Sequence, residues 1–163
     1  MNMKRIVKTL SFVLIASLLF VGCSQSSNDK DKQTTNLEVT QESGGMKITI
    51  NMELIHDGKR VYNQNQTSKM VASDAATYEY MDTYVDNSDL AKEAEKYDGA
   101  EYKLVKDEKE LTITEVINLD FTKLSAEGYK VMTMGQVDLG DNYYIDYEKT
   151  LENLEGQGFK VVE

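Results

Sequence analysis

A run of alternating apolar and polar residues constrains the fold of this chain more than any other feature. From Met46 to Leu54 every second residue is apolar, and the residues between are Lys, Thr, Asn and Glu. Successive side chains of a strand point to opposite faces of a sheet. A period of two therefore predicts a strand with one face on a core and the other in water.

A hairpin follows this strand. The segment His56 to Lys59 contains Asp-Gly, which supplies the positive φ angle that a tight turn needs. Arg60 to Lys69 then predicts the returning strand. Its centre, Asn63 to Gln66, is polar on both faces, and we interpret this as a strand at the edge of the sheet.

The rest of the chain alternates helical and hairpin patterns. Ala76, Tyr80 and Tyr84 share one helix face, and a final helix with Tyr147, Leu151 and Leu154 on one face begins after the capping residue Asp146. Further predicted elements are a helical stretch from Leu90 to Tyr97, a hairpin from Tyr102 to Leu119, a short helix through Phe121 and Leu124 stopped by Gly128, a strand from Tyr129 to Met134, a loop from Gly135 to Asn142, and a strand from Phe159 to Val162. Hairpins dominate this order. We therefore expect an α+β fold, with a mainly antiparallel sheet and two main helices packed on one face.

The N-terminus has the pattern of a secretory signal peptide. Lys4, Arg5 and Lys8 precede a run of about 13 uncharged, mostly apolar residues from Thr9 to Val21. A membrane-spanning helix needs roughly 20 apolar residues, so this run is too short for one. The sequence predicts export across a membrane.

The signal peptide ends at the single cysteine of the chain. Val21-Gly22-Cys23 resembles the lipobox of bacterial lipoproteins, although Phe20 stands where that pattern prefers Leu. The resemblance implies cleavage between Gly22 and Cys23 and a diacylglyceryl group on the Cys23 thiol. Two acyl chains of the palmitate kind give durable anchoring. We therefore expect a lipid-anchored protein on the extracytoplasmic face of the cell membrane.

The segment after the cysteine is strongly polar. Ser24 to Gly45 is rich in Ser, Asn, Gln, Asp and Lys, a composition that does not support a packed core. We interpret residues 23–45 as the lipidated cysteine and a flexible, disordered tether. The predicted organisation is a signal peptide over 1–22, this tether, and a single α+β domain over 46–163.

The charge of the chain argues against two classes of partner. Removal of the signal peptide leaves 15 basic residues against 28 acidic ones, a net charge of about −13. Nucleic-acid binding requires a basic face, and docking on anionic lipid through the protein surface requires basic clusters. We expect no nucleic-acid partner, a membrane contact through the lipid alone, an unidentified envelope ligand or protein as partner, and a monomer.

Several segments together resemble the YehR-like family of uncharacterised bacterial lipoproteins. After the lipobox and the first alternating strand, the resemblance lies in the order and spacing of Tyr97-Asp98-Gly99, Thr114-Glu115, Leu119 to Leu124, and Leu154 to Lys160. It implies a small α+β lipoprotein domain with no established activity.

We find no catalytic or metal motif in the sequence. His56 is the only histidine, and we interpret it as an exposed turn residue beside Asp57, because no nucleophile accompanies it. Two acidic clusters could offer oxygen ligands to calcium, but neither has the spacing of an EF-hand loop. They are Asp82, Asp86 and Asp89, and Asp138, Asp141 and Asp146. We therefore predict no catalytic residue, no metal site and no cofactor.

The ten tyrosines offer the one candidate binding surface. Tyr78, Tyr143 and Tyr144 could line a groove for a glycan or peptide, since tyrosine has a flat apolar face and a polar tip. Core packing is the alternative interpretation of the same residues.

The sequence thus predicts a cell-envelope lipoprotein with a non-enzymatic binding or structural role. The alternatives are an envelope enzyme such as a carbohydrate hydrolase, and a calcium-responsive module. A further alternative is release of a signal-peptide fragment, Ile15 to Gly22, as a short apolar pheromone.

Overall fold

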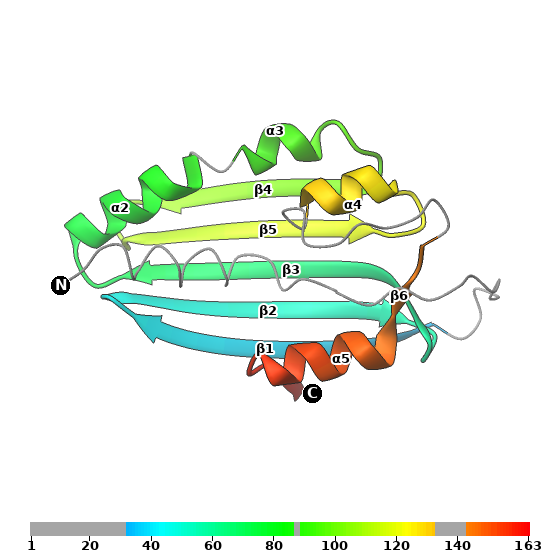
Figure 1. Ribbon diagram of the computed structural model, residues 1–163. Coiled ribbons are helices and arrows are strands. Elements are labelled where there is room, and N and C mark those ends of the chain that lie inside the picture. Colours follow the sequence, from blue (N-terminus) through cyan, green and yellow to red (C-terminus); the bar gives the residue numbers. More distant parts are fainter. Residues whose placement is uncertain (1–31, 87–88, 133–142) are drawn as a thin grey trace.

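The computed structural model describes residues 32–86, 89–132 and 143–163. Their elements, coloured along the chain in Figure 1, run in the order β1 (Gln33–Ser43), β2 (Met46–His56), β3 (Arg60–Ala72), α2 (Ala75–Asp86), α3 (Leu90–Ala94), β4 (Ala100–Asp107), β5 (Thr112–Asp120), α4 (Ala126–Met132), β6 (Ile145–Asp146), α5 (Tyr147–Gly156) and β7 (Lys160–Val162).

One antiparallel sheet organises the fold. Its strand order is β4-β5-β3-β2-β1-β7, and β6 pairs with the start of β3. Hairpins join β1 to β2, β2 to β3, and β4 to β5, and each of these pairings is antiparallel. The prediction of a mainly antiparallel α+β fold is confirmed.

The core lies between one face of this sheet and the helices. The apolar positions predicted from Met46 to Leu54 are all buried, and so are the inward residues of α2, Tyr78, Met81 and Val85. Figure 1 shows α4 and α5 in front of the sheet. The opposite face carries the outward-pointing residues of the strands, most of which are polar, and no helix of the described part of the chain covers it.

The flexible tether predicted over 23–45 is wrong for residues 33–43, which form β1. Leu37 and Val39 are buried against the core, whereas their neighbours point outward. Gly44 and Gly45 close the hairpin to β2 with positive φ angles of 59° and 84°. Ladder hydrogen bonds compensate for the low apolar content of β1, because its backbone pairs with β2 along its whole length and with β7 from Asn36 to Glu38.

The edge position predicted for the second strand is also wrong. β3 lies in the middle of the sheet, between β2 and β5. Gln64 and Gln66 point into the core and are only 2% and 1% exposed. Gln64 Nε2 donates to Gln66 Oε1 at 3.4 Å, and Gln66 Nε2 donates to Ser68 Oγ at 3.1 Å. Polar side chains that satisfy one another are tolerated in a core, so their polarity did not indicate an edge.

The region after β5 differs from the predicted order of helix, then strand. Phe121 to Lys123 form a turn, and the helix α4 begins later, at Ala126, and includes Gly128 and Tyr129. Ser125 favours this start, because its Oγ accepts the backbone N–H of Gly128 at 3.0 Å. The predicted strand is therefore wrong for Tyr129 to Met132. Residues 133–142 lie outside the described part of the chain.

Candidate functional site

Among the residues that the structure describes, Glu115 is the one buried carboxyl group on the helix-covered face of the sheet. It lies on β5 between the buried residues Ile113 and Ile117, and it is only 1% exposed. In the sheet register it is opposite Leu104 on β4 and Ser68 on β3. The alternation of β5 thus directs an ionisable side chain into the core.

Tyr102 of β4 supplies the hydrogen bond that this carboxyl group receives. The Tyr102 hydroxyl donates to Glu115 Oε1 at 2.7 Å, and Oε2 has no hydrogen-bond partner among the residues that the structure describes. Burial raises the pKa of Glu115 from its ordinary value of 4.5 to about 7, and the bond from Tyr102 limits the rise. A buried acid with an unpartnered oxygen is stable in its protonated form.

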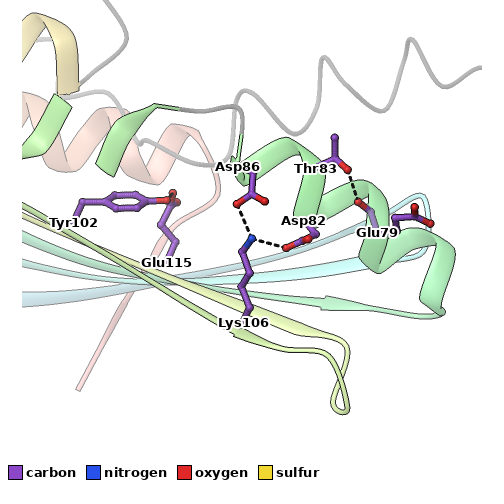
Figure 2. A network of polar contacts seen from close by, with 7 residues as sticks. All are labelled: Glu79, Asp82, Thr83, Asp86, Tyr102, Lys106 and Glu115. Carbon is purple, nitrogen blue, oxygen red and sulfur yellow. Dashed lines mark hydrogen bonds and ion pairs between the residues drawn. The ribbon is translucent and has the colours of Figure 1, made fainter. Parts of the chain in front are cut away.

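An ion-pair group lies beside this acid, between β4 and α2. Lys106 of β4 contacts Asp82 Oδ1 at 2.7 Å and Asp86 Oδ1 at 2.6 Å with its Nζ atom. Hydrogen bonds to Asp82 and Asp86 raise the pKa of Lys106, so this ammonium stays charged. Figure 2 shows Lys106 under α2 and Glu115 beside Tyr102, past the end of α2 that carries Asp86, with both side chains on the same side of the sheet. Lys106 therefore fastens α2 to β4 close to Glu115.

A second polar group joins β1, β2 and α5 around His56. This histidine is 3% exposed, so its interpretation as an exposed turn residue is wrong. Gly58 N donates to its Nδ1 at 3.0 Å, which places the proton of the neutral ring on Nε2, 2.9 Å from Thr35 Oγ1. The Thr35 hydroxyl contacts the Tyr147 hydroxyl at 2.9 Å, and the Tyr147 ring stacks on His56 at 3.6 Å between centroids. These contacts fix the ring as part of the packing.

A polar hollow lies near the start of β4, between the uncovered face of the sheet and the α3–β4 connection. Its volume is about 520 Å³, and Asn63, Asn65, Asn118, Glu101 and Asp120 are among the residues that line it. Glu53, Asn65, Asn118 and Glu101 form a row across four strands. In this row Asn65 Nδ2 donates to Glu53 at 2.7 Å and Asn118 Nδ2 to Glu101 at 3.3 Å. This face can offer hydrogen bonds to a polar ligand.

The tyrosines predicted to line one groove do not lie together. Tyr78 is buried on α2, which follows the end of β3, and it faces the core. Tyr143 and Tyr144 precede β6, which pairs with the opposite end of β3. The Tyr143 hydroxyl donates to the carbonyl oxygen of Leu124 at 2.6 Å, so it takes part in packing. None of these tyrosines lines the polar hollow.

The acidic clusters are engaged in other contacts. Asp82 and Asp86 bind Lys106, whereas Asp89 binds Lys92 at 2.8 Å. Asp146 caps α5 as predicted, since its side chain accepts the Lys149 N–H at 3.0 Å. Asp138 and Asp141 lie outside the described residues, and within the described ranges no three metal-ligating side chains gather into a site.

The predicted lipidation and cleavage residues, Cys23 and Gly22, lie outside the described part of the chain. Among the residues described, no helix has the length and apolar character to cross a membrane.

Of these features, the Glu115 pair has the clearest chemistry, because it can bind and release a proton near neutral pH. Sequence reasoning did not single out Glu115. The signal was the apolar alternation of Leu111, Ile113, Ile117 and Leu119. Position 115 belongs to the same alternating set, so its side chain points into the core.

Comparison with solved structures shows the fold. An NMR structure of a protein from Streptococcus pneumoniae TIGR4 matches with a TM-score of 0.55 and 12% identity, over 88% of this chain and 92% of that protein. The NMR structure of the E. coli YehR protein matches with a TM-score of 0.56 and 15% identity, over 80% of this chain and 92% of YehR. No protein-family model and no curated protein matches the chain.

The similarity to YehR agrees with the fold that the sequence resemblance implied. At these identities it establishes the architecture alone. Neither protein's name states an activity, a ligand or a location.

Proposed function

We propose that this chain is a cell-envelope lipoprotein, anchored by lipid at Cys23, whose sheet domain is a non-enzymatic binding or structural module. The observation that carries the proposal is the N-terminal sequence, in which a basic segment and a short apolar run end at Gly22-Cys23. Cys23 is the only cysteine, so no second cysteine in this chain can form a disulfide with it.

The position of β1 supports a tether shorter than the sequence pattern suggested. β1 begins at Gln33, ten residues after Cys23. A chain of this length reaches at most roughly 35 Å. The folded domain would stay near the membrane surface, and its acidic charge would favour separation from anionic lipid.

A binding or structural role is supported by the uncovered sheet face. Its row of amides and carboxylates and its hollow of about 520 Å³ present polar groups to the envelope. Polar rows of this kind recognise a partner through hydrogen bonds, with no requirement for a reacting group.

Processing in cells tests the anchor. Globomycin blocks cleavage of lipoprotein signal peptides, so treated cells should accumulate a heavier precursor. Cys23→Ala should remove the lipid mass and change the distribution of the protein between membrane and soluble fractions. Ser24→Ala is the matched control and should behave as wild type. An unchanged mass with globomycin, together with a Cys23→Ala protein that is still processed and membrane-bound, would contradict the proposal.

One observation favours a second candidate, an envelope carbohydrate hydrolase. The raised pKa of Glu115, about 7, suits a general acid. Such enzymes pair two carboxyl groups about 5 to 10 Å apart. In this candidate the second carboxyl group would come from Asp82 or Asp86 of α2, which both contact Lys106. Hydrolysis of envelope glycans by the wild type and its loss in Glu115→Gln would establish this candidate. Absence of hydrolysis by the wild type would remove it.

A further inference from the structure

Ionised Glu115 would lack a cationic partner in the folded structure. Its Oε1 accepts the Tyr102 hydroxyl and its Oε2 is buried without a partner among the described residues. The facing side chains of β3, which are Gln66, Ser68 and Met70, carry no charge. A negative charge here is therefore neither hydrated nor paired, a costly arrangement in a core.

The charged groups on the other packed elements are already engaged with one another. β4 contributes Tyr102 and Lys106 to this face, and α2 contributes Tyr78, Asp82 and Asp86. α3, which also packs on β4, contributes the apolar Leu90 and Ala94. Lys106 is the one cation among these described groups, and both aspartates of α2 bind it. Lys106 can turn to Glu115 only by leaving α2, and water can reach Glu115 only if the layer above it opens.

We propose that Glu115 is a proton-binding switch that controls how firmly α2 is held on β4 and β5. In the closed form the proton lies on Oε2, since Oε1 accepts the Tyr102 hydroxyl. Loss of this proton to bulk water leaves a carboxylate that competes with Asp82 and Asp86 for Lys106. Release of Lys106 frees the C-terminal part of α2 (Figure 2).

The direction of the pH response follows from the two states of the carboxyl group. Its pKa is about 7 in the closed form and close to the ordinary 4.5 when α2 opens. The closed form therefore binds its proton more tightly, and opening becomes easier as pH rises from about 4.5 to about 7. Each pH unit in this window changes the equilibrium by about tenfold, and the response levels off above pH 7.

Hydrogen exchange of the full chain in detergent micelles tests the switch. Exchange rates of α2 amides, corrected for the intrinsic effect of pH, should rise on the order of a hundredfold between pH 5 and pH 7. Peptides from β2 should stay far more protected than α2 at each pH, because α2 opens without global unfolding. Glu115→Gln should abolish the rise. Lys106→Met should raise α2 exchange at every pH and remove most of the pH dependence, because no ion pair is left for the Glu115 carboxylate to break. Glu110→Gln, an exposed acid in the β4–β5 turn, is the matched control and should match wild type.

Three results would overturn the proposal. They are α2 exchange without pH dependence in the wild type, an unchanged pH dependence in Glu115→Gln, and α2 exchange no faster than that of β2, which would indicate global unfolding. If Glu115→Gln does not fold, a carboxyl-carbon NMR titration of the wild type decides. A Glu115 midpoint near 7, shared with α2 amide shifts, supports the switch, and a midpoint near 4.5 overturns it.

Discussion

Two buried ionisable side chains make the stability of the fold depend on pH in opposite directions. Glu115 is most stable in the fold when protonated, because burial disfavours its charge. His56 is most stable when neutral, since Gly58 donates to its Nδ1 and burial lowers its pKa below 6.5, against the opposing effect of Asp57. The folded state therefore loses stability when either group takes its charged form.

Glu115→Gln should stabilise the protein at pH 8 and have little effect at pH 4. The wild type loses stability as pH rises from 4.5 through about 7, a difference of about 2.5 pKa units, or about 3 kcal/mol at 1.36 kcal/mol per unit. Urea unfolding at both pH values measures the difference. Equal effects of the substitution at pH 4 and pH 8 would contradict the assignment of this pH dependence to Glu115.

Protonation of His56 should weaken the packing of α5 on β1 and β2. The lowered pKa means that its contribution to stability is present above pH 6.5 and is lost as pH falls through the folded-state pKa. NMR should show His56 neutral at pH 6.5, with shifts in Thr35 and Tyr147 when it titrates at lower pH. A midpoint at or above 6.5 would disprove the packed, neutral state. His56→Ala should cost about 1 to 3 kcal/mol, because Thr35 and Tyr147 lose their partner.

The sequence could reveal which face of the sheet these residues point to, but not which residues they contact. Glu115 alternates in step with Ile113 and Ile117, so its inward direction was predictable. The partners of His56 come from β1 and α5, more than 20 and 90 residues away along the chain. Such contacts depend on the sheet order, which the sequence pattern does not specify.

At the scale of elements, one denaturation measurement can decide whether residues 33–43 form a strand or a tether. Leu37 is 1% exposed, so Leu37→Ala should lower the free energy of unfolding by about 2 to 4 kcal/mol. Glu38→Ala, on the outward face of the same strand, should change it by less than about 0.5 kcal/mol. Chemical denaturation followed by circular dichroism measures both. Two neutral substitutions would restore the tether interpretation.

The connection from α3 to β4 depends on Gly99. Its φ angle is 86°, and a Cβ atom there would lie 2.6 Å from the Asp120 carbonyl oxygen. Gly58 has nearly the same φ angle, 87°, but a Cβ atom there would meet nothing within 4 Å. Gly58→Ala should cost about 1 to 2 kcal/mol from backbone strain alone. Gly99→Ala should cost at least about 2 kcal/mol more, since backbone must move. Equal melting temperatures would refute the steric argument.

Elements with a strong period were predictable, and those defined by tertiary contacts were not. The alternation of β2 and the Asp146 cap of α5 are local signals, and both are confirmed. β3 has a polar centre whose glutamines bond to each other in the core. Glycine favours a helix end, so the sequence predicts one at Gly128, yet this residue lies inside α4, where a Cβ atom would lie 2.9 Å from the Tyr97 ring. In both cases packing overrides the local preference.

At the scale of the whole molecule, the sheet has two distinct ends. Gln33, where β1 begins, pairs with His56, so the N-terminal end of β1 lies beside the β2–β3 turn. The β4–β5 turn lies beyond Val71, at the other end of β3. β3 has 13 residues, and at about 3.3 Å each the two ends are about 40 Å apart. An anchor at Cys23, as we propose, would bring the β2–β3 turn closer to the membrane.

Energy transfer to the bilayer tests this orientation. A donor dye on Lys59→Cys, in the β2–β3 turn, should transfer to acceptor lipids more efficiently than the same dye on Lys109→Cys, in the β4–β5 turn. Both positions are exposed, and a lipidated Cys23 would not react with the dye. The roughly 35 Å reach from Cys23 to Gln33 is less than the span of β3, so free tumbling cannot fully equalise the two ends. Equal or reversed transfer in the membrane-bound protein would contradict an anchor at the Gln33 end of the sheet.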